Sequence, residues 1–71
     1  MQASGRNKLP GVVTEVRIEG LMAQVSLRCG DNHIVALISA EAARELDLKV
    51  GGIATALVKA TSVMIVRDSF D

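Results

Sequence analysis

The sequence predicts one mainly β domain of five short strands, with one short helix between the third and fourth strands. Apolar and polar residues alternate with a period of two over most of the chain, which is typical of half-buried strands. Clusters of Gly, Asp and Asn separate these runs, and a single segment rich in Ala and Glu interrupts them. Five short strands and one helix in this order favour a small, partly closed barrel of the OB type.

The first two strands are predicted at residues 9–18 and 21–29, joined by a turn at Glu19-Gly20. The first opens at Pro10-Gly11 and has the even-numbered apolar residues from Val12 to Ile18 on one face. In the second, alternate residues form an inward face, which consists of Ala23, Val25, Leu27 and Cys29. A hairpin loop at residues 30–32 follows, built from residue types that tolerate positive φ.

The third predicted strand, His33–Ile38, is apolar on both faces from Ile34 onward. A strand of this kind is covered on both sides, either by its own chain or by another subunit. Ser39 then stands where a helix N-cap belongs, ahead of a two-turn helix over residues 40–46. A loop over residues 47–52 leads to the last two predicted strands, at residues 53–58 and 61–66.

Length and composition bound the kind of protein further. The 71 residues form one domain, 1–71, with a frayed tail from about residue 67, and their 49% hydrophobic content is too high for a disordered segment. The core of so small a domain is thin. Because a single cysteine forms no internal disulfide, we expect the chain to gain stability as a homo-oligomer. Without a secretory signal or a bilayer-spanning run, we expect a cytoplasmic location and no membrane association.

Several function classes are disfavoured. Eight basic and eight acidic residues give zero net charge, and Phe70 is the only aromatic residue, so we expect no nucleic-acid partner. His33 stands alone beside a hairpin loop, and Cys29 lies on the inward face of its strand, where an inert thiol is expected. These residues favour neither an enzyme nor a metal held directly by protein ligands.

Small polar residues and cations at the ends of the predicted elements suggest a different chemistry. Ser4 and Arg6 lie near the N-terminus, Ser39 begins the helix, and Lys59 precedes Thr61-Ser62 between the last two strands. A tetrahedral oxyanion presents only acceptor oxygens, so a ring of N–H and O–H donors with one or two cations suits it. The alternative is that Ser39 is simply an N-cap and that Arg6 and Lys59 are ordinary solvated charges.

Taken in order, these segments resemble the molybdate-binding Mop domain, the molbindin type, over nearly the whole chain. The resemblance lies in residues 4–7 followed by 9–11, in 36–39 with Glu41, in 46–51 and in 58–65. No single segment is specific, whereas their order and spacing together are. Ala42 departs from the family pattern, which has a serine there that often supplies a ligand hydroxyl.

The resemblance implies a fold and a function. The fold is an OB-like barrel in which subunits exchange a strand, and free-standing members assemble as hexamers, trimers of dimers. The function is cytoplasmic binding of molybdate, or its mimic tungstate, for storage and homeostasis, without catalysis and without a cofactor. The alternative is an oligomerisation or regulatory domain of the same fold whose anion site is weakened or lost.

The resemblance also implies which residues bind the oxyanion. One subunit contributes Ser4, the Gly5 amide, Arg6, Lys59 and the Ala60 amide, and its neighbour contributes Ser39. A second site lies on the threefold axis of hexamers, at the turn after the first strand. In this sequence that turn is Gly20, Leu21 and Met22.

Overall fold

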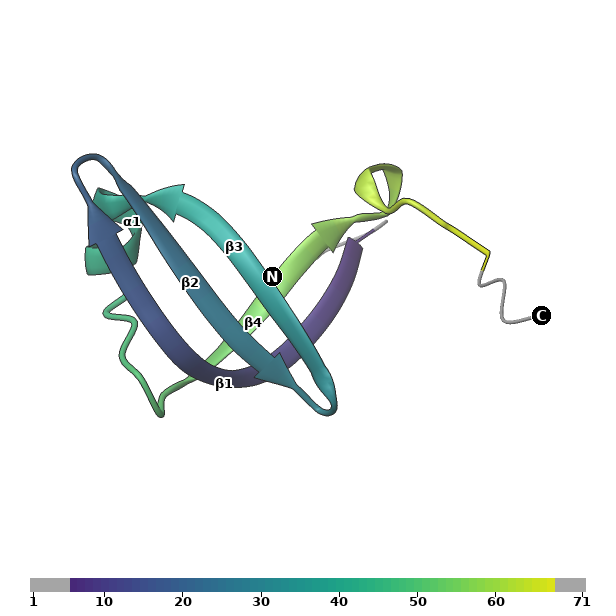
Figure 1. The fold of residues 1–71 in the computed structure, drawn as a ribbon, viewed down its shortest axis with the longest axis horizontal. Coiled ribbons are helices and arrows are strands. Elements are labelled where there is room, and N and C mark those ends of the chain that lie inside the picture. The colour runs from purple at the N-terminus through teal and green to yellow at the C-terminus, as the bar shows by residue number, and fades with distance from the viewer. Residues whose placement is uncertain (1–5, 68–71) are drawn as a thin grey trace.

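The structure, a computed structural model, describes residues 6–67. The elements are β1 (Arg6–Glu19), β2 (Met22–Cys29), β3 (Asn32–Ser39), α1 (Ala40–Glu45), β4 (Ile53–Lys59) and the 3-10 helix η1 (Ala60–Ser62). The four strands form one antiparallel sheet in the order β3-β2-β1-β4. Figure 1 shows this sheet curled on itself, with α1 at one end of β1 and η1 at the other.

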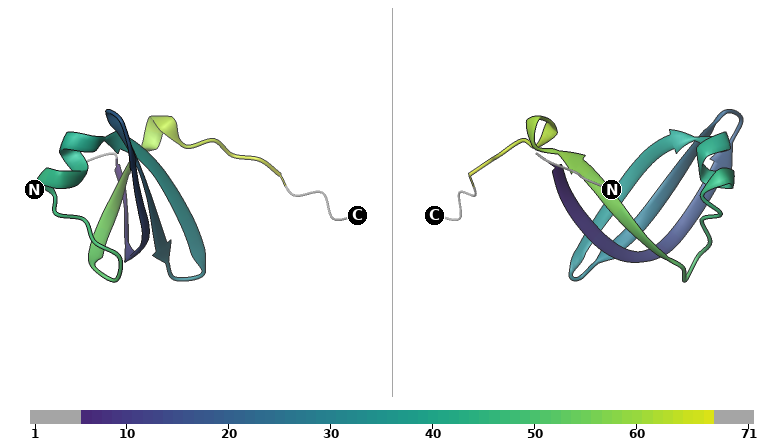
Figure 2. Two further views of the ribbon diagram at one scale, coloured as in Figure 1. Left: turned by 60° about the vertical axis from the view of Figure 1, so that its left-hand side comes forward. Right: turned by 180° about the vertical axis from the view of Figure 1, so that it is seen from behind.

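The curl comes from β1, which pairs with two strands in succession. Residues 6–12 of β1 pair with β4, and residues 12–19 pair with β2. Pro10 therefore lies where β1 has a ladder partner on one side only, so its missing N–H leaves no gap in a second ladder. The edge strands β3 and β4 do not pair with each other within the described residues, and the sheet is a half-barrel (Figure 2).

A β-bulge corrects the simple alternation predicted for the first strand. The register between β1 and β2 shifts between Val13 and Glu15, so that two residues of β1 lie opposite Ser26. As a result Val13 is 1% exposed, whereas Val12, on the predicted apolar face, is 44% exposed. Val16 returns to the core side after the bulge. The extra residue shifts the inward-facing positions of β1 from odd-numbered to even-numbered residues, and it bends the strand.

The core lies on the concave side of the sheet, where the inward face predicted for the second strand is confirmed. Val13, Val25, Leu27 and Cys29 form the buried cluster. Cys29 is a free, buried thiol whose Sγ donates to the carbonyl oxygen of Leu9 at 3.4 Å.

Only one face of β3 is covered by the part of the chain that the structure describes. Ile34, Ala36 and Ile38 are half-buried, and Ile34 and Ile38 pack against the core cluster, whereas Leu37 is 68% exposed and Val35 is exposed as well. The third strand was predicted to be covered on both sides. The chain itself covers one of them.

The short helix begins where the sequence predicts it. Ser39 is the N-cap, and its Oγ accepts the amide of Ala42 at 3.0 Å. The amide of Ala40 donates to the carbonyl of Leu21 at 2.8 Å, which ties the start of α1 to the turn between β1 and β2. The buried side chains of Ala40 and Ala43 hold the helix against the end of the sheet.

The prediction of a fifth strand at residues 61–66 is wrong for the single chain. Ala60–Ser62 form η1, and residues 63–67 have no regular structure. The cause is the lack of a partner, since an apolar segment becomes a strand only when a neighbour completes its ladder. Met64 and Ile65 are each 87% exposed on a segment that leads away from the sheet (Figures 1 and 2). The predicted frayed tail falls mostly on residues 68–71, outside the described part of the chain.

Gly11 lies where β1 passes from β4 to β2, and the two strands β1 and β2 are very close there. A Cβ added at Gly11 would lie 2.7 Å from the Sγ of Cys29 and against the backbone of Arg28. We predict that Gly11→Ala destabilises the chain by about 1–3 kcal/mol through overpacking, measured as the free energy of unfolding in urea at fixed protein concentration. Gly20→Asn is the control, because Gly20 has open space and a φ of +58° that Asn tolerates. Equal stability of the Gly11→Ala variant and wild type would contradict the crowding at this position.

Candidate oxyanion-binding site

Two of the predicted cationic residues meet at one end of the sheet. Arg6, the first residue of β1, and Lys59, the last residue of β4, are cross-strand partners. The predicted strands ended short of both residues, at Leu9 and Val58, so the sequence identified the two cations without showing that they are opposite each other. The strands extend by three residues and one residue, respectively, and this extension creates the pair.

The surroundings of this pair offer further hydrogen-bond donors. The chain turns directly after Lys59 into η1, so the N–H of Ala60, its first residue, has no intrahelical acceptor. Among residues 6–67, no ion pair involves Lys59. Ser4 and Gly5, which the sequence also assigns to this site, lie outside the described residues.

Ser39 lies at the opposite end of the sheet from the two cations. It pairs with Met22 of β2, which in turn pairs with Glu19, the last residue of β1. Arg6 is the first of the 14 residues of β1, so at roughly 3.3 Å per residue the strand separates the two ends by about 40 Å along its length. The structure therefore does not bring Ser39 of one chain to Lys59 of the same chain.

The capping role of Ser39 leaves its hydroxyl able to bind an anion. A serine hydroxyl can accept hydrogen bonds and also donates one. The N-cap contact uses an acceptor position of Oγ, through the amide of Ala42. The hydroxyl proton remains available as a donor, so the ordinary structural role of Ser39 and a ligand role are compatible.

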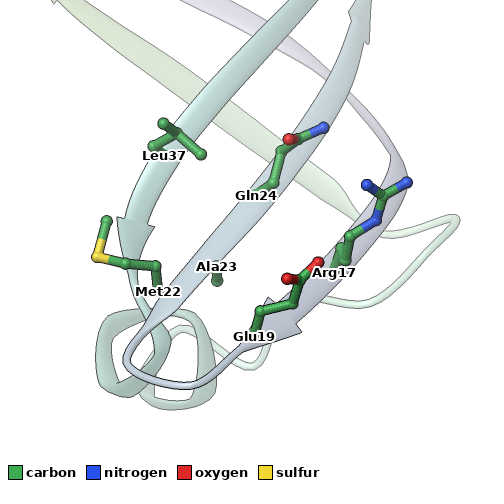
Figure 3. A pocket seen from close by; sticks show the side chains of 6 residues that line it. All are labelled: Arg17, Glu19, Met22, Ala23, Gln24 and Leu37. Atoms are coloured by element: carbon green, nitrogen blue, oxygen red, sulfur yellow. The ribbon is translucent and has the colours of Figure 1, made fainter.

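The turn assigned to the axial site also lies at the Ser39 end. Gly20 has a positive φ of 58°, and Leu21 is strongly exposed. Beside the turn is a depression of about 200 Å³, shown in Figure 3. It is lined by Arg17, Glu19, Met22, Ala23, Gln24 and Leu37.

The charges of this depression differ from those at the β1–β4 end. Arg17 is already paired with Glu15, with 3.2 Å between Nη2 and Oε2. Glu19 adds a carboxylate to the lining (Figure 3). The lining of this depression therefore carries one basic and one acidic side chain and offers a dianion no net positive charge.

Two further properties describe residues 6–67. They contain no group of three or more His, Cys, Asp and Glu side chains arranged to hold a metal ion. None of their helices is long and apolar enough to cross a membrane.

Known proteins of similar sequence are named for molybdenum. Molybdenum-pterin-binding protein 2 of Clostridium pasteurianum is 41% identical over 66 residues, which are 92% of this chain and 97% of that protein. Molybdenum transport protein ModE of Azotobacter vinelandii is 38% identical over 69 residues. Those residues are 96% of this chain, which spans only about a quarter (26%) of ModE.

Solved structures share the fold. A molybdate-binding protein from Sporomusa ovata has a TM-score of 0.89 and 37% identity, over 94% of this chain and 100% of that chain. ModG, described as a cytoplasmic molybdate-binding protein and solved with molybdate bound, has a TM-score of 0.85 and 34% identity. That match covers 90% of this chain and 46% of the ModG chain.

A family model, the TOBE domain, matches residues 3–65. This match covers the whole curled sheet, both cations at its end and residues 63–65 after η1. The chain therefore belongs to the TOBE domain family and is a homologue of the Mop-like molybdenum-pterin-binding proteins.

Proposed function

We propose that this chain is a molybdate-binding protein whose site is built on Arg6 and Lys59. The observation that carries the proposal is their direct pairing across β1 and β4. Like charges that are directly opposite on neighbouring strands repel each other. A dianion between them removes this repulsion and gains two attractive contacts, so the pair favours a bound oxyanion.

The remaining donors distinguish the anion by its size and shape. In this proposal Ser4 and the amides of Gly5 and Ala60 surround the tetrahedral oxygens, while the two cations balance the charge. Molybdate is unprotonated at neutral pH and accepts hydrogen bonds on every oxygen, so N–H and O–H donors suit it. Two cations suffice, which is consistent with a chain of zero net charge. Tungstate has the same shape and charge and is expected to bind as well.

A second copy of the chain completes the site in this proposal. Within the described part of the chain the Ser39 hydroxyl donates no hydrogen bond, but Ser39 lies at the far end of β1 from Lys59. Within one chain the two cannot share a ligand, whereas the Ser39 end of a neighbour can approach the Lys59 end. The anion then bridges two subunits.

The segment after η1 supports an exchange of strands between subunits. A groove of about 300 Å³ is lined by β2, β3 and β4 together with Leu46 and Leu48, and Thr55 is its only polar residue. Residues 63–66 are apolar and exposed and have no partner strand within the described part of their own chain. We propose that residues 61–66 of a second copy occupy this groove as the fifth strand and close the half-barrel.

The wider proposal follows from these contacts. The chain acts as one Mop-like domain over residues 1–71, and its dimers associate into hexamers, trimers of dimers. A second site forms where the Gly20, Leu21 and Met22 turns of three subunits meet. The protein holds molybdate in the cytoplasm for storage and homeostasis and catalyses no reaction. The names and descriptions of its homologues support the molybdate binding and the cytoplasmic location within this proposal.

Charge removal at the proposed site tests its location. We predict that Arg6→Ala and Lys59→Ala each weaken molybdate binding by about tenfold to a hundredfold, since each removes a charged hydrogen-bond donor. Isothermal titration calorimetry with sodium molybdate measures the effect. Lys8→Ala is the matched control, because Lys8 is a cation of the same strand that pairs with Leu57 and not with a charge.

The affinity of the Lys8→Ala variant is expected to stay within about threefold of wild type, as is usual for a surface charge outside a site. Equal affinities of the Arg6→Ala, Lys59→Ala and Lys8→Ala variants would contradict a site at this rung. A wild-type chain that assembles but takes up no molybdate would favour the alternative, an oligomerisation domain that has lost its anion site.

A charge within the exposed C-terminal segment tests the strand exchange. We predict that Ile65→Lys lowers the molar mass of the assembly, because a lysine side chain in an apolar groove loses its hydration. Size-exclusion chromatography with light scattering measures the molar mass, and circular dichroism shows whether the sheet is retained.

Val50→Lys is the control, because Val50 is also an exposed apolar residue but lies in the loop before β4, away from the groove. The molar mass of the Val50→Lys assembly is expected to equal that of the wild-type assembly. An Ile65→Lys variant with the molar mass of wild type would rule out an exchanged strand at residues 61–66.

A further inference from the structure

Asn7 connects the two strand ends that carry the cations of the proposed site. Its side-chain Nδ2 donates to the carbonyl oxygen of Val58 at 3.3 Å, across the β1–β4 ladder. Asn7 directly follows Arg6, and Val58 directly precedes Lys59. Among the side chains of β1 that the structure describes, residues 7–19, only Asn7 makes a hydrogen bond to the backbone of β4.

The bond controls the peptide group that leads into Lys59. A peptide unit is planar, so the carbonyl of Val58 and the N–H of Lys59 rotate together. Fixing the Val58 carbonyl therefore fixes the direction in which the backbone enters Lys59 and then Ala60. On β1, the side chain that makes this bond belongs to the residue directly after Arg6.

This position matters because the rung beyond Asn7 carries two like charges. Arg6 and Lys59 are the outermost partners in the β1–β4 register, and the chain leaves the sheet immediately afterwards through η1. Like charges at directly opposite positions of neighbouring strands are destabilising, which favours opening of the ladder at this end. A cross-strand hydrogen bond one rung inward opposes that opening.

We infer that Asn7 is a positioning residue for the oxyanion site, a role that rests on the proposed function. It does not contact the anion. Before the anion binds, Asn7 already holds the two strand ends at the spacing at which Arg6 and Lys59 can share one dianion. The strand ends therefore lose less conformational freedom when the anion binds.

Asn7→Ala tests this role, with Thr14→Ala as the matched control. Thr14 is on the same strand and makes the same kind of bond, from Oγ1 to the carbonyl of Ser26 at 3.3 Å, but far from the cations. We expect Asn7→Ala to weaken binding of sodium molybdate by about threefold to tenfold, as for loss of one neutral hydrogen bond. We expect Thr14→Ala to leave the affinity within about twofold of wild type.

Amide hydrogen exchange separates positioning from general stability. In Asn7→Ala, without molybdate, exchange is expected to rise at residues 6 and 59 and to stay unchanged in the β2–β3 hairpin. Faster exchange throughout the sheet, or a drop in affinity matched by Thr14→Ala, would show a merely structural role and overturn the inference.

The two proposals fail in different ways. A wild-type chain that binds no molybdate would overturn the proposed function, and the positioning role with it. A wild-type chain that binds molybdate, with an Asn7→Ala variant of equal affinity, would overturn the role of Asn7 alone and leave the site at Arg6 and Lys59 intact.

Discussion

The double pairing of β1 is the constraint on which the rest of the structure depends. A strand of 14 residues that pairs first with β4 and then with β2 cannot stay flat, because the twist of each pair accumulates along it. The bulge between Val13 and Glu15 adds a bend just after the change of partner. Close contact of the backbones at Gly11 makes the change of partner possible. The result is a half-barrel whose concave side contains the core.

The same constraint separates the two halves of the proposed site. Because β1 is shared, its first residue meets the end of β4 and its last residue meets the start of β2. Lys59 and Ser39 are therefore at opposite ends of one chain. A fold of this shape has the two cations at one end and the helix-capping hydroxyl of Ser39 at the other. A ligand that needs both must therefore lie between two copies of the chain. The open groove and the exposed residues 63–66 are the observations behind the proposed exchange of strands between copies.

Most of the fold could be predicted from local patterns. The inward face of β2, the N-cap at Ser39 and the helix after it each depend on neighbouring residues, and all three are confirmed. The buried face of β1 could not be read correctly, because a single bulged residue shifts a period of two without changing composition. The fifth strand was wrong for the single chain because strand propensity in residues 61–66 says nothing about which chain supplies the partner.

For the candidate site as well, the sequence predicts the individual residues but not how they are arranged in space. Residue types and a family resemblance identify Arg6, Lys59 and Ser39 as separate donors. Their relation in space depends on the β1–β4 register, which no local pattern encodes, because residues 6 and 59 lie more than fifty positions apart in the sequence. The hydrogen bond of Asn7 to Val58 is of the same long-range kind. The structure was needed to show that Arg6 and Lys59 are cross-strand partners and that Ser39 lies at the other end of the sheet.

Native mass spectrometry of the wild-type chain, with and without sodium molybdate, tests most directly whether the site exists only between copies. It reports subunit number and bound anions in the same ion. The expected result is molybdate on assemblies of two or more chains, six above all, and none on the residual monomer. Monomers that bind molybdate as readily as the assemblies would contradict a site shared between subunits.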